Sequence, residues 1–333
     1  MRAILMTAAG GPEVLQLADI PVPELPSPSH LRVKLCAAGV NPVDTKLRKG
    51  GVPVLPAVLG CDGAGVVESV GASVTRFQPG DEVFFFNGGI GTEQGNYAEY
   101  TVIHEDYAAA KPQRLSMNAA AALPLVWITA WESLHDRAQL KAGESVLIHA
   151  AAGGVGHVAV QLAKHLGARV AVTVSGPDKA AFAKALGADR LIDYKAEDFV
   201  TAALDWTDGQ GVDVVFDTVG GETFCRSFGA AKVYGKVVTL LQTACEAGDL
   251  KTARSRNQSI HYELMLTPLQ LDMHSARVNQ RKMLEAASGL IEGGKLNIRV
   301  NQVLPLNQAE AAHRLIEGGH MSGKAVLEIA PGS

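Results

Sequence analysis

A glycine-rich turn between a hydrophobic strand and an amphipathic helix most constrains what this chain can fold into. The segment ESVLIHAAAGGVGHVAVQLAKHLGARVAVTV, residues 144–174, begins with an apolar run that ends at His149. The turn Ala151-Ala152-Gly153-Gly154-Val155-Gly156 follows, and then apolar residues recur at helical spacing until Gly167. The turn matches a G-x-G-x-x-G pattern with alanine in the first position. A strand, a glycine turn, a helix and a second strand in this order predict a dinucleotide-binding unit.

The two key glycines of this turn have separate physical roles. Gly153 has no side chain to keep a pyrophosphate away from the backbone, and Gly156 lets the helix pack closely on the strand. The unpaired N–H groups of the first helical turn then point at the phosphates. A purely structural strand–turn–helix unit is the alternative that the pattern leaves open.

Strands and helices continue to alternate after this turn. Several predicted strands are apolar runs without alternation, which is typical of a parallel sheet covered by helices on both faces. The predicted strands are Val146–His149, Arg169–Val174, Leu191–Tyr194, Val212–Asp217, Lys236–Leu241 and Ile260–Met265. The predicted helices are Val155–Leu166, Pro177–Leu186, Glu197–Leu204 and Thr223–Ala231. Six such strands predict a doubly wound parallel sheet of the α/β class.

The remaining parts of the chain have a different pattern. From residue 1 to about 124, short β-rich runs such as LRVKLCAAGV and DEVFFF are broken by glycine and proline, which predicts an irregular β domain. From residue 268 on, the predicted elements are a long amphipathic helix, a strand, a helix and a last strand: Val278–Ile291, Ile298–Val303, Gln308–Glu317 and Ala325–Ile329. We therefore predict domain limits at 1–124, 125–267 and 268–333, where the last segment either extends the second domain or rejoins the first.

Charge and composition exclude several classes of protein. With 30 basic and 34 acidic residues the net charge is −4, so we expect no nucleic-acid partner, and the basic stretch Lys251–Arg256 is predicted to be a solvated loop. No run reaches the ~20 apolar residues that cross a bilayer, and no signal-peptide pattern is present, which predicts a cytoplasmic protein without a membrane partner. The four cysteines, Cys36, Cys61, Cys225 and Cys245, contain no C-x-x-C pair. We therefore predict reduced, mostly buried thiols and no zinc ribbon.

The end of the second predicted strand favours a phosphorylated cofactor. A carboxylate there would accept hydrogen bonds from both ribose hydroxyls and favour NAD, but the chain has Val174-Ser175-Gly176-Pro177. Asp178, which follows the proline, is predicted to lie in the first turn of a helix. Ser175 and Lys179 leave room and positive charge for a 2′-phosphate. We therefore predict NADP(H), with Lys179 as an ordinary solvated helix residue as the alternative.

Motifs along the whole chain resemble the medium-chain dehydrogenase/reductase superfamily, and within it the zinc-independent, zeta-crystallin-like quinone oxidoreductase branch. The motifs are AAGVNPVDTKLRKG, LGCDGAGVVESVG, FQPGDEVF, GNYAEY, HAAAGGVG, LGADRLIDY, GVDVVFDTVGG and SGKAVLEI. The resemblance implies a GroES-like β-rich catalytic domain, completed by the C-terminal stretch, and a Rossmann domain, with the cofactor in the cleft between them. It also implies a homodimer, often formed through the last edge strand of the nucleotide domain, here near Ile260–Met265.

The resemblance also implies site residues. Asn41 would face the reacting carbonyl, and Lys324 either reaches the cofactor or is an exposed loop lysine. The residues expected to contact the cofactor are Gly153, Gly154 and Val155 at the pyrophosphate, Ser175, Lys179 and Tyr194 at the 2′-phosphate, Thr218, Val219, Gly220, Leu241 and Gln242 along the cleft, and Thr129 near the nicotinamide.

Zinc ligands are missing where the resemblance would place them. Zinc-dependent relatives have a cysteine in place of Asn41-Pro42 and a Gly-His-Glu step in place of Gly60-Cys61-Asp62. We therefore expect no metal, because the chain has no such Lewis-acid site. A residual site formed by Cys61, Asp62 and His104 is the alternative, and Cys61 is expected to be a small packed thiol.

Three other polar residues are predicted to be structural. Asp44 is expected to cap the helical turn after Pro42, Glu99 to point outward from its strand, and His149 to end a strand beside the glycine turn. We assign none of them a chemical role.

Together these features predict hydride transfer from NADPH to a quinone or an α,β-unsaturated carbonyl compound. Such an acceptor develops negative charge on oxygen, and hydrogen-bond donors can stabilise that charge without a metal. The Asn41 amide is the candidate donor, and a turn residue before Pro42 is its structural alternative. A zinc-free alcohol dehydrogenase or enoyl reductase is a second hypothesis, although several relatives have tyrosines where this chain has Lys46 and Val52. A non-catalytic, crystallin-like NADPH-binding protein is a third.

Overall fold

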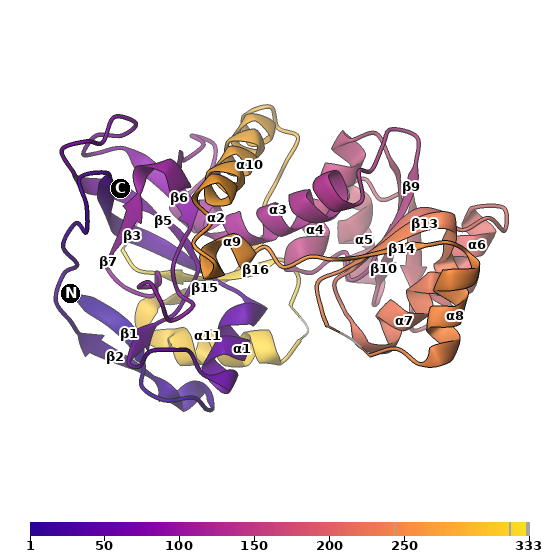
Figure 1. Ribbon diagram of the computed structural model, residues 1–333, viewed down its shortest axis with the longest axis horizontal. Coiled ribbons are helices and arrows are strands. Elements are labelled where there is room, and N and C mark those ends of the chain that lie inside the picture. The colour runs from indigo at the N-terminus through magenta and orange to yellow at the C-terminus, as the bar shows by residue number, and fades with distance from the viewer. Residues whose placement is uncertain (243, 320, 331–333) are drawn as a thin grey trace. The chain divides into compact units, whose positions relative to one another are not determined.

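Contacts within the chain divide it into two compact units. The computed structural model describes residues 1–242, 244–319 and 321–330. One unit consists of Met1–Leu125 together with Leu266–Ser333, and the other of Val126–Met265. In Figure 1 the first unit therefore carries both ends of the colour scale, indigo and yellow.

The first unit is built on a seven-stranded sheet and a three-stranded sheet. The strand order is β15-β16-β3-β5-β6-β8 with β7 also paired to β3, and β2-β1-β4 in the smaller sheet. The strands are β1 (Arg2–Met6), β2 (Leu15–Asp19), β3 (His30–Val40), β4 (Ala57–Val58), β5 (Asp62–Val70), β6 (Glu82–Phe86), β7 (Tyr100–His104), β8 (Ala108–Ala110), β15 (Val300–Pro305) and β16 (Lys324–Glu328). Strand β16 pairs antiparallel with β3, so the C-terminal segment rejoins the N-terminal sheet.

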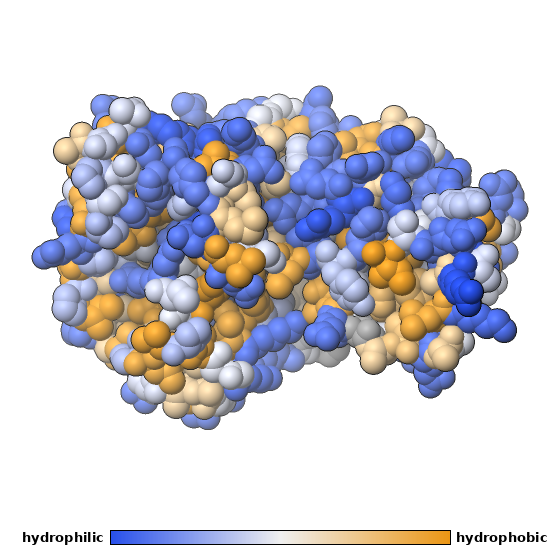
Figure 2. All heavy atoms as spheres, in the orientation of Figure 1, coloured by the Kyte–Doolittle hydropathy of each residue, from blue (hydrophilic) through white to orange (hydrophobic). Residues whose placement is uncertain are grey.

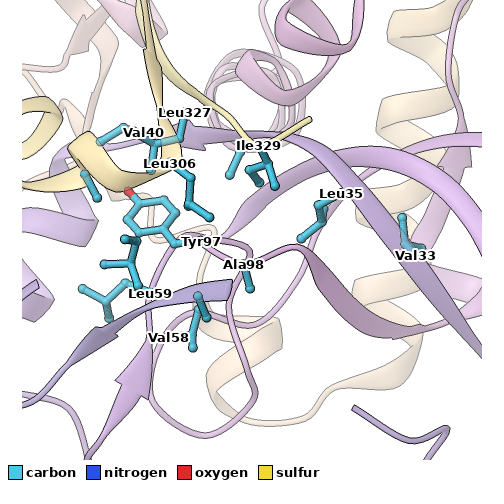
Figure 3. Close-up of a cluster of buried hydrophobic side chains, with 14 of the residues drawn as sticks. Val33, Leu35, Val40, Val58, Leu59, Tyr97, Ala98, Leu306, Leu327 and Ile329 are labelled. Carbon is cyan, nitrogen blue, oxygen red and sulfur yellow. The ribbon is translucent and has the colours of Figure 1, made fainter. Parts of the chain in front are cut away.

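Helices and a shared core complete the first unit. The helices are α1 (Pro42–Gly50), α2 (Met117–Ala122), α9 (Thr267–Gln270), α10 (His274–Glu292) and α11 (Ala309–Glu317), with short 3₁₀ turns η1 (Pro12–Val14), η2 (Glu105–Tyr107) and η4 (Leu306–Gln308). Figure 3 shows Leu306 and Leu327, from the C-terminal segment, packed with Leu59 and Val40 around the ring of Tyr97. Because the C-terminal segment fills this core, the N-terminal segment alone lacks part of its apolar interior.

The second unit contains one sheet of six strands, all parallel, in the order β11-β10-β9-β12-β13-β14. The strands are β9 (Ser145–Ile148), β10 (Arg169–Val174), β11 (Arg190–Asp193), β12 (Val212–Asp217), β13 (Ala231–Thr239) and β14 (Ser259–Tyr262). The helical elements are α3 (Pro124–Trp131), the π-helix η3 (Glu132–Arg137), α4 (Gly154–His165), α5 (Pro177–Ala185), α6 (Phe199–Trp206), α7 (Gly221–Ala230) and α8 (Ala247–Ser255). This order confirms the predicted doubly wound sheet, whose direction of winding changes between β9 and β12.

Two local predictions about the second unit are wrong. Lys251–Arg256 was expected to be a loop, but α8 extends to Ser255, because Ala253 is buried in the core beside α7. Reduced thiols were expected throughout, but Cys225 on α7 and Cys245 before α8 form a disulfide. Their 20-residue separation gives no indication that α7 and the start of α8 are neighbours. Cys36 and Cys61 are buried free thiols, as predicted.

The surface of the described residues is mixed. Figure 2 shows hydrophobic residues scattered among hydrophilic ones on the face in view, as is usual for a globular protein. Within residues 1–242, 244–319 and 321–330, no helix has the length and apolar character needed to cross a bilayer.

Candidate functional site

The glycine turn has the geometry that its sequence predicts. Gly153 is the N-cap of α4, and the helix begins at Gly154. A Cβ atom on Gly156 would lie 2.3 Å from the carbonyl oxygen of Ala150 and 2.8 Å from the Cα atom of Ala151. Such distances are far inside van der Waals contact, so α4 can pack against the end of β9 only with glycine at position 156. The predicted close packing of helix and strand is confirmed.

His149, at the start of this turn, forms hydrogen bonds with side chains of β10 and α7. Ser227 Oγ donates to the carbonyl of Thr223, so its oxygen accepts from Nε2–H of His149 at 3.1 Å. Nδ1 of His149 then accepts from Thr173 Oγ1 at 3.2 Å, and the Thr173 oxygen accepts from the Ala150 amide at 3.0 Å. Burial lowers the pKa of His149 to about 4, so the ring is neutral at pH 7. His149 thus directly follows β9 beside the glycine turn, as predicted, and its contacts support the predicted structural role.

The carboxyl ends of four strands meet around a cavity of about 490 Å³ within the second unit. The hydroxyl of Thr218, after β12, donates to the carbonyl of His149 at 3.0 Å, and the amide of Tyr194, after β11, donates to Val174 at 3.3 Å. The cavity lining includes His149, Ala150, Thr173, Tyr194 and Val219. Its volume is in the range of small-molecule sites, and it adjoins the start of the glycine turn.

Residues expected at a 2′-phosphate lie on consecutive segments of this edge. Ser175 directly follows β10, and Gly176, with φ +82°, is the N-cap of α5. Asp178 and Lys179 lie in the first turn of α5, which agrees with the prediction for Asp178. Ser175 and Tyr194 are brought close, because β10 and β11 are paired and Tyr194 bonds to the last residue of β10.

The loops after β12 and β13 are joined by a buried polar pair that sequence reasoning missed. Asp217 Oδ1 accepts from the amides of Val219 and Gly220 at 3.0 Å each, and its Oδ2 accepts from Thr239 Oγ1 at 2.7 Å. Thr239 Oγ1 in turn accepts from the amide of Leu241 at 3.2 Å. The structure thus brings together the two segments that carry Thr218–Gly220 and Leu241–Gln242. The acid at the end of the apolar run VDVVFD is the sequence signal that could have indicated this buried pair.

Thr129 is a buried residue of α3, in the second unit with all the other predicted cofactor residues except Lys324. Asn41 and Lys324 lie in the first unit, where the structure brings the two side chains into contact. The Asn41 amide nitrogen donates to Asp62 Oδ2 at 2.9 Å, and its oxygen accepts from Lys324 Nζ. Lys324 also donates to the Val40 carbonyl at 3.2 Å and lies 3.7 Å from Asp62. All of these side chains are buried, so the alternative of an exposed loop lysine is wrong.

Burial acts on the charges of this cluster. It raises the pKa of Asp62 and lowers the pKa of Lys324, and each group opposes the shift of the other through its charge. The Leu125 amide donates to Asp62 Oδ1 at 2.8 Å and helps hold the carboxylate. Because Asn41 is bonded at both ends of its amide group, its orientation is fixed: the ammonium group can meet only the oxygen, and the carboxylate only the nitrogen.

A line of hydrogen bonds leads from Asn41 to α11. Asn41 and Asp44 form the capping box of α1, as predicted for Asp44, and Asp44 Oδ2 accepts from the backbone N–H of Asn41 at 2.8 Å. Asp44 Oδ2 also accepts from the Tyr97 hydroxyl at 2.9 Å. Arg48 only donates, so Nδ1 of His313 accepts from it at 3.4 Å, and Nε2–H of His313 donates to the Tyr97 oxygen at 3.3 Å. Every donor in this line therefore points toward Asp44.

Burial has opposite effects on the two titratable ends of this line. It raises the pKa of Asp44 to about 7 and lowers the pKa of His313 to about 4. Sequence reasoning missed Tyr97 and His313, which contact Asp44 and Arg48 only through long-range packing. Glu99, by contrast, pairs with Arg2 at 2.7 Å near the surface, in agreement with its predicted outward direction.

The alternative metal site of Cys61, Asp62 and His104 finds no support in the geometry. Within the part of the chain that the structure describes, the one trio of His, Cys, Asp or Glu donors within 4.8 Å of one another is Cys225, Cys245 and Asp249, and its two sulfurs are bonded to each other. Cys61 is a packed, fully buried thiol, as expected, and burial raises its pKa. His104 lies instead against His30 and His274, with ring centroids 5.3 and 5.6 Å away.

Two family models match the chain. An "Alcohol dehydrogenase GroES-like domain" matches residues 27–113, and a "Zinc-binding dehydrogenase" model matches residues 186–327. Together they match parts of both units.

Similar proteins cover nearly the whole chain. The quinone oxidoreductase of Pseudomonas aeruginosa is 36% identical over 329 residues, which are 98% of this chain and 99% of that protein. A 2-haloacrylate reductase of a Burkholderia species is 32% identical and covers 98% of both chains. The solved structure of the Escherichia coli quinone oxidoreductase complexed with NADPH has a TM-score of 0.87 at 31% identity, and the match covers 99% of this chain and 100% of that one. The chain therefore belongs to the quinone oxidoreductase branch of the medium-chain dehydrogenase/reductase superfamily.

Proposed function

We propose that this protein is an NADPH-dependent oxidoreductase that reduces quinones and other conjugated carbonyl compounds. The observation that carries the proposal is the glycine turn at the centre of the parallel sheet, with Gly156 packed against Ala150 and with Gly153, Gly154 and Val155 partly exposed at the start of α4. Full-length similarity to quinone oxidoreductases and to a 2-haloacrylate reductase supports the choice of acceptor. Because NADPH is an intracellular metabolite, the proposal includes a cytoplasmic location.

The residues at the carboxyl edge of the sheet fit a phosphorylated dinucleotide. Gly153, Gly154 and Val155 would hold the pyrophosphate with the first amide groups of α4. Ser175 and Lys179, with no acid at the end of β10, would take the 2′-phosphate beside Tyr194. When bound, NADPH supplies the hydride.

The other predicted contacts extend this site along the sheet edge. Asp217 and Thr239 hold the amides of Val219, Gly220 and Leu241 in place, which supports a role for both loops in cofactor binding. The residues proposed to line the cofactor here are Thr129, Thr218, Val219, Gly220, Leu241 and Gln242.

Asn41 is the proposed donor to the acceptor oxygen. Its amide nitrogen carries two hydrogens, and Asp62 accepts one of them. The second would stabilise the negative charge that develops on the carbonyl oxygen. Lys324, which is bonded to the amide oxygen, is proposed to keep this N–H group in position.

A panel of acceptors tests the proposal. Purified protein should oxidise NADPH with 1,2-naphthoquinone, phenanthrenequinone or a simple enone, and should use NADH less efficiently. Reduction of NAD⁺ by alcohols would instead indicate a zinc-free alcohol dehydrogenase. Tight NADPH binding without turnover of any acceptor would indicate a binding protein.

Two variants locate the cofactor and the donor. Lys179→Glu should raise the KM for NADPH about tenfold or more and leave the KM for NADH nearly unchanged, because it reverses a charge at the 2′-phosphate. Lys184→Glu, on the exposed last turn of the same helix, is the matched control.

Asn41→Ala should lower kcat by about 10²–10³, the typical cost of losing one such donor. An unchanged kcat in a folded variant would remove Asn41 from the mechanism.

The edge strand β14 supports a homodimer. It is the last strand of the sheet and exposes Ile260 and Tyr262, and the neighbouring strand β13 exposes Val233 and Tyr234. An uncovered apolar edge of this kind favours pairing with a second copy about a two-fold axis. Light scattering should give twice the mass of the chain, and Ile260→Lys with Tyr262→Lys should give the mass of one chain. A monomeric parent protein would contradict the proposal.

A further inference from the structure

The disulfide between Cys225 and Cys245 lies beside the proposed cofactor segments and is not used by the proposed reaction. Cys225 is in the second turn of α7, which directly follows Thr218–Gly220. Cys245 immediately precedes Glu246, the N-cap of α8, and comes shortly after Leu241 and Gln242. The disulfide therefore joins α7, which follows the proposed cofactor contacts after β12, to the segment that carries the proposed cofactor contacts after β13.

The segment after β13 is held at two points. Near its start, the Leu241 amide donates a hydrogen bond to the Thr239 hydroxyl, which donates one to Asp217. The side chains of Thr239 and Asp217 are fully buried. Near its end, the covalent bond joins Cys245 to α7. Leu241 is the residue held at the first attachment, and Gln242 lies between the two.

Opening the disulfide would leave the rest of the unit in place. Ala253 on α8 packs in one apolar cluster with Phe224 and Phe228 of α7, so the two helices remain joined without the sulfur–sulfur bond. The effect of reduction is therefore local to the segment before α8. Its second attachment is lost, and ordering Leu241 and Gln242 around a ligand then costs more conformational entropy.

The two cysteines of the bond differ in exposure. Cys225 is buried, whereas Cys245 is partly exposed between the exposed residues Ala244 and Glu246. We therefore expect an incoming thiolate to attack the sulfur of the more exposed Cys245, form a mixed disulfide with it and release Cys225 as the leaving thiolate. The other two cysteines, Cys36 and Cys61, are buried and unpaired, so they cannot take part in this exchange without unfolding.

We propose that Cys225 and Cys245 form a reversible redox site that exchanges with thiols of the glutathione class, and that the disulfide state binds NADPH more tightly than the dithiol state. The second part rests on the proposed function. In the balanced exchange, the protein disulfide and two thiols RSH give two protein thiols and one RSSR, and oxidation by RSSR is the reverse. Disulfides in reducing compartments are usually catalytic or redox-sensing rather than structural, which agrees with this assignment.

The first experiment follows the thiols alone. The protein is equilibrated in buffers of graded reduced-to-oxidised glutathione ratio, and free thiols are tagged with a maleimide after denaturation and counted by mass. Two tags should be present at the oxidised end and four at the reduced end, with one reversible transition. Cys36→Ser should lose one tag throughout and keep the transition, and Cys225→Ser with Cys245→Ser should abolish it. Four tags in oxidised glutathione would overturn the proposal.

The second experiment measures cofactor affinity in the two states. Disulfide and dithiol forms are desalted to remove the reductant, which would itself react with quinones, and NADPH is titrated by fluorescence and by initial rates. The dithiol form should have a Kd and KM for NADPH about threefold to tenfold higher, with kcat nearly unchanged. The double serine variant should have the same Kd and KM for NADPH as the dithiol form, and reductant should change neither value.

The outcomes separate this proposal from the proposed function. Equal NADPH affinity of the two states would overturn the link between the redox site and the cofactor. Failure of both states to bind or oxidise NADPH would overturn the proposed function, whereas the tag counts would still report the redox site.

Discussion

At the scale of single residues, Gly156 decides how closely α4 can approach β9. A methyl group at this position would meet backbone atoms of Ala150 and Ala151, which no rotation of a side chain can relieve. Gly156→Ala should therefore lower the free energy of unfolding by about 1–3 kcal/mol and weaken NADPH binding, because the turn must move. Gly289→Ala in α10, where a new Cβ atom meets nothing within 4 Å, is the control and should stabilise by about 1 kcal/mol. Urea unfolding and NADPH titration of both variants check this prediction.

Tyr97 is the residue whose hydroxyl supports the charge of Asp44. Tyr97→Phe removes one donor from the buried carboxylate and should cost about 1–3 kcal/mol of stability. The folded-state pKa of Asp44 is raised, to about 7, so its contribution to stability is complete at low pH and is lost as pH rises toward 7.

The loss of the Tyr97 donor should therefore depend on pH. Without this donor the pKa of Asp44 should rise further, so the variant should lose more stability relative to the parent at pH 8 than at pH 5. Urea unfolding at both values measures the difference, and Tyr100→Phe, at a partly exposed position of β7 in the same unit, is the control. An equal difference at both pH values would contradict the assigned role of the hydroxyl.

At the scale of elements, α6 illustrates a helix start that depends on one side chain. Asp198 is the N-cap and accepts from the Thr201 amide at 2.9 Å, and it also pairs with Arg226 of α7. Asp198→Ala should destabilise the second unit by about 1 kcal/mol, whereas Asp198→Asn, which keeps an accepting oxygen, should cost less. Thermal unfolding of the two variants compares them, and equal losses would assign the effect to the ion pair instead of the cap.

Elements with strong local patterns were the ones that could be predicted from the sequence. The turn before α4 and the strands β10 and β12 are each defined by residues adjacent in the chain, and their bounds agree closely with the prediction. Strand β13 was expected from Lys236 but begins at Ala231, because pairing with β12 extends it over residues that carry no apolar run. Helix α8 was not predicted for a related reason: its buried residue is Ala253, which forms no apolar pattern with its neighbours.

The site could be predicted only where its residues belong to one segment. The capping role of Asp44 follows from Asn41-Pro42-Val43-Asp44, and the structure confirms it. The contact between Lys324 and Asn41 and the bond between Cys225 and Cys245 depend on how distant segments pack, which a single sequence does not show. The catalytic and cofactor roles of the predicted residues stay predictions.

At the scale of the whole molecule, His149 in the second unit and His313 in the first are buried, neutral histidines. Burial lowers the pKa of His149 and of His313 to about 4, below the ordinary 6.5, so folding is favoured above pH 6.5 and loses stability as pH falls toward 4. At pH 5 each histidine should cost up to about 2 kcal/mol relative to pH 7. Asp44 acts in the opposite direction over this window, so the parent protein shows only the sum.

Variants isolate the histidine contributions. His313→Gln should lose less stability than the parent protein between pH 7 and pH 5, and His149→Asn should do the same for the second unit. Thermal unfolding at the two pH values gives the comparison. His165→Gln, at the exposed end of α4, is the control, because it leaves both buried histidines in place. Equal acid sensitivity of the parent and both buried-histidine variants would contradict these assignments.

The discontinuity of the first unit has a consequence for synthesis on the ribosome. Strand β3 emerges early, but its partner β16 and the side chains of Leu306, Leu327 and Lys324 are made only after the second unit. The whole of the second unit leaves the exit tunnel after β3 and before β16, so it can fold before the sheet of the first unit is complete. Strand β7 already pairs with the first half of β3, but residues 37–40 of β3 stay unpaired on this edge until β16 is made. An unpaired strand edge can pair with another chain, so we expect chaperone binding to matter most at this stage.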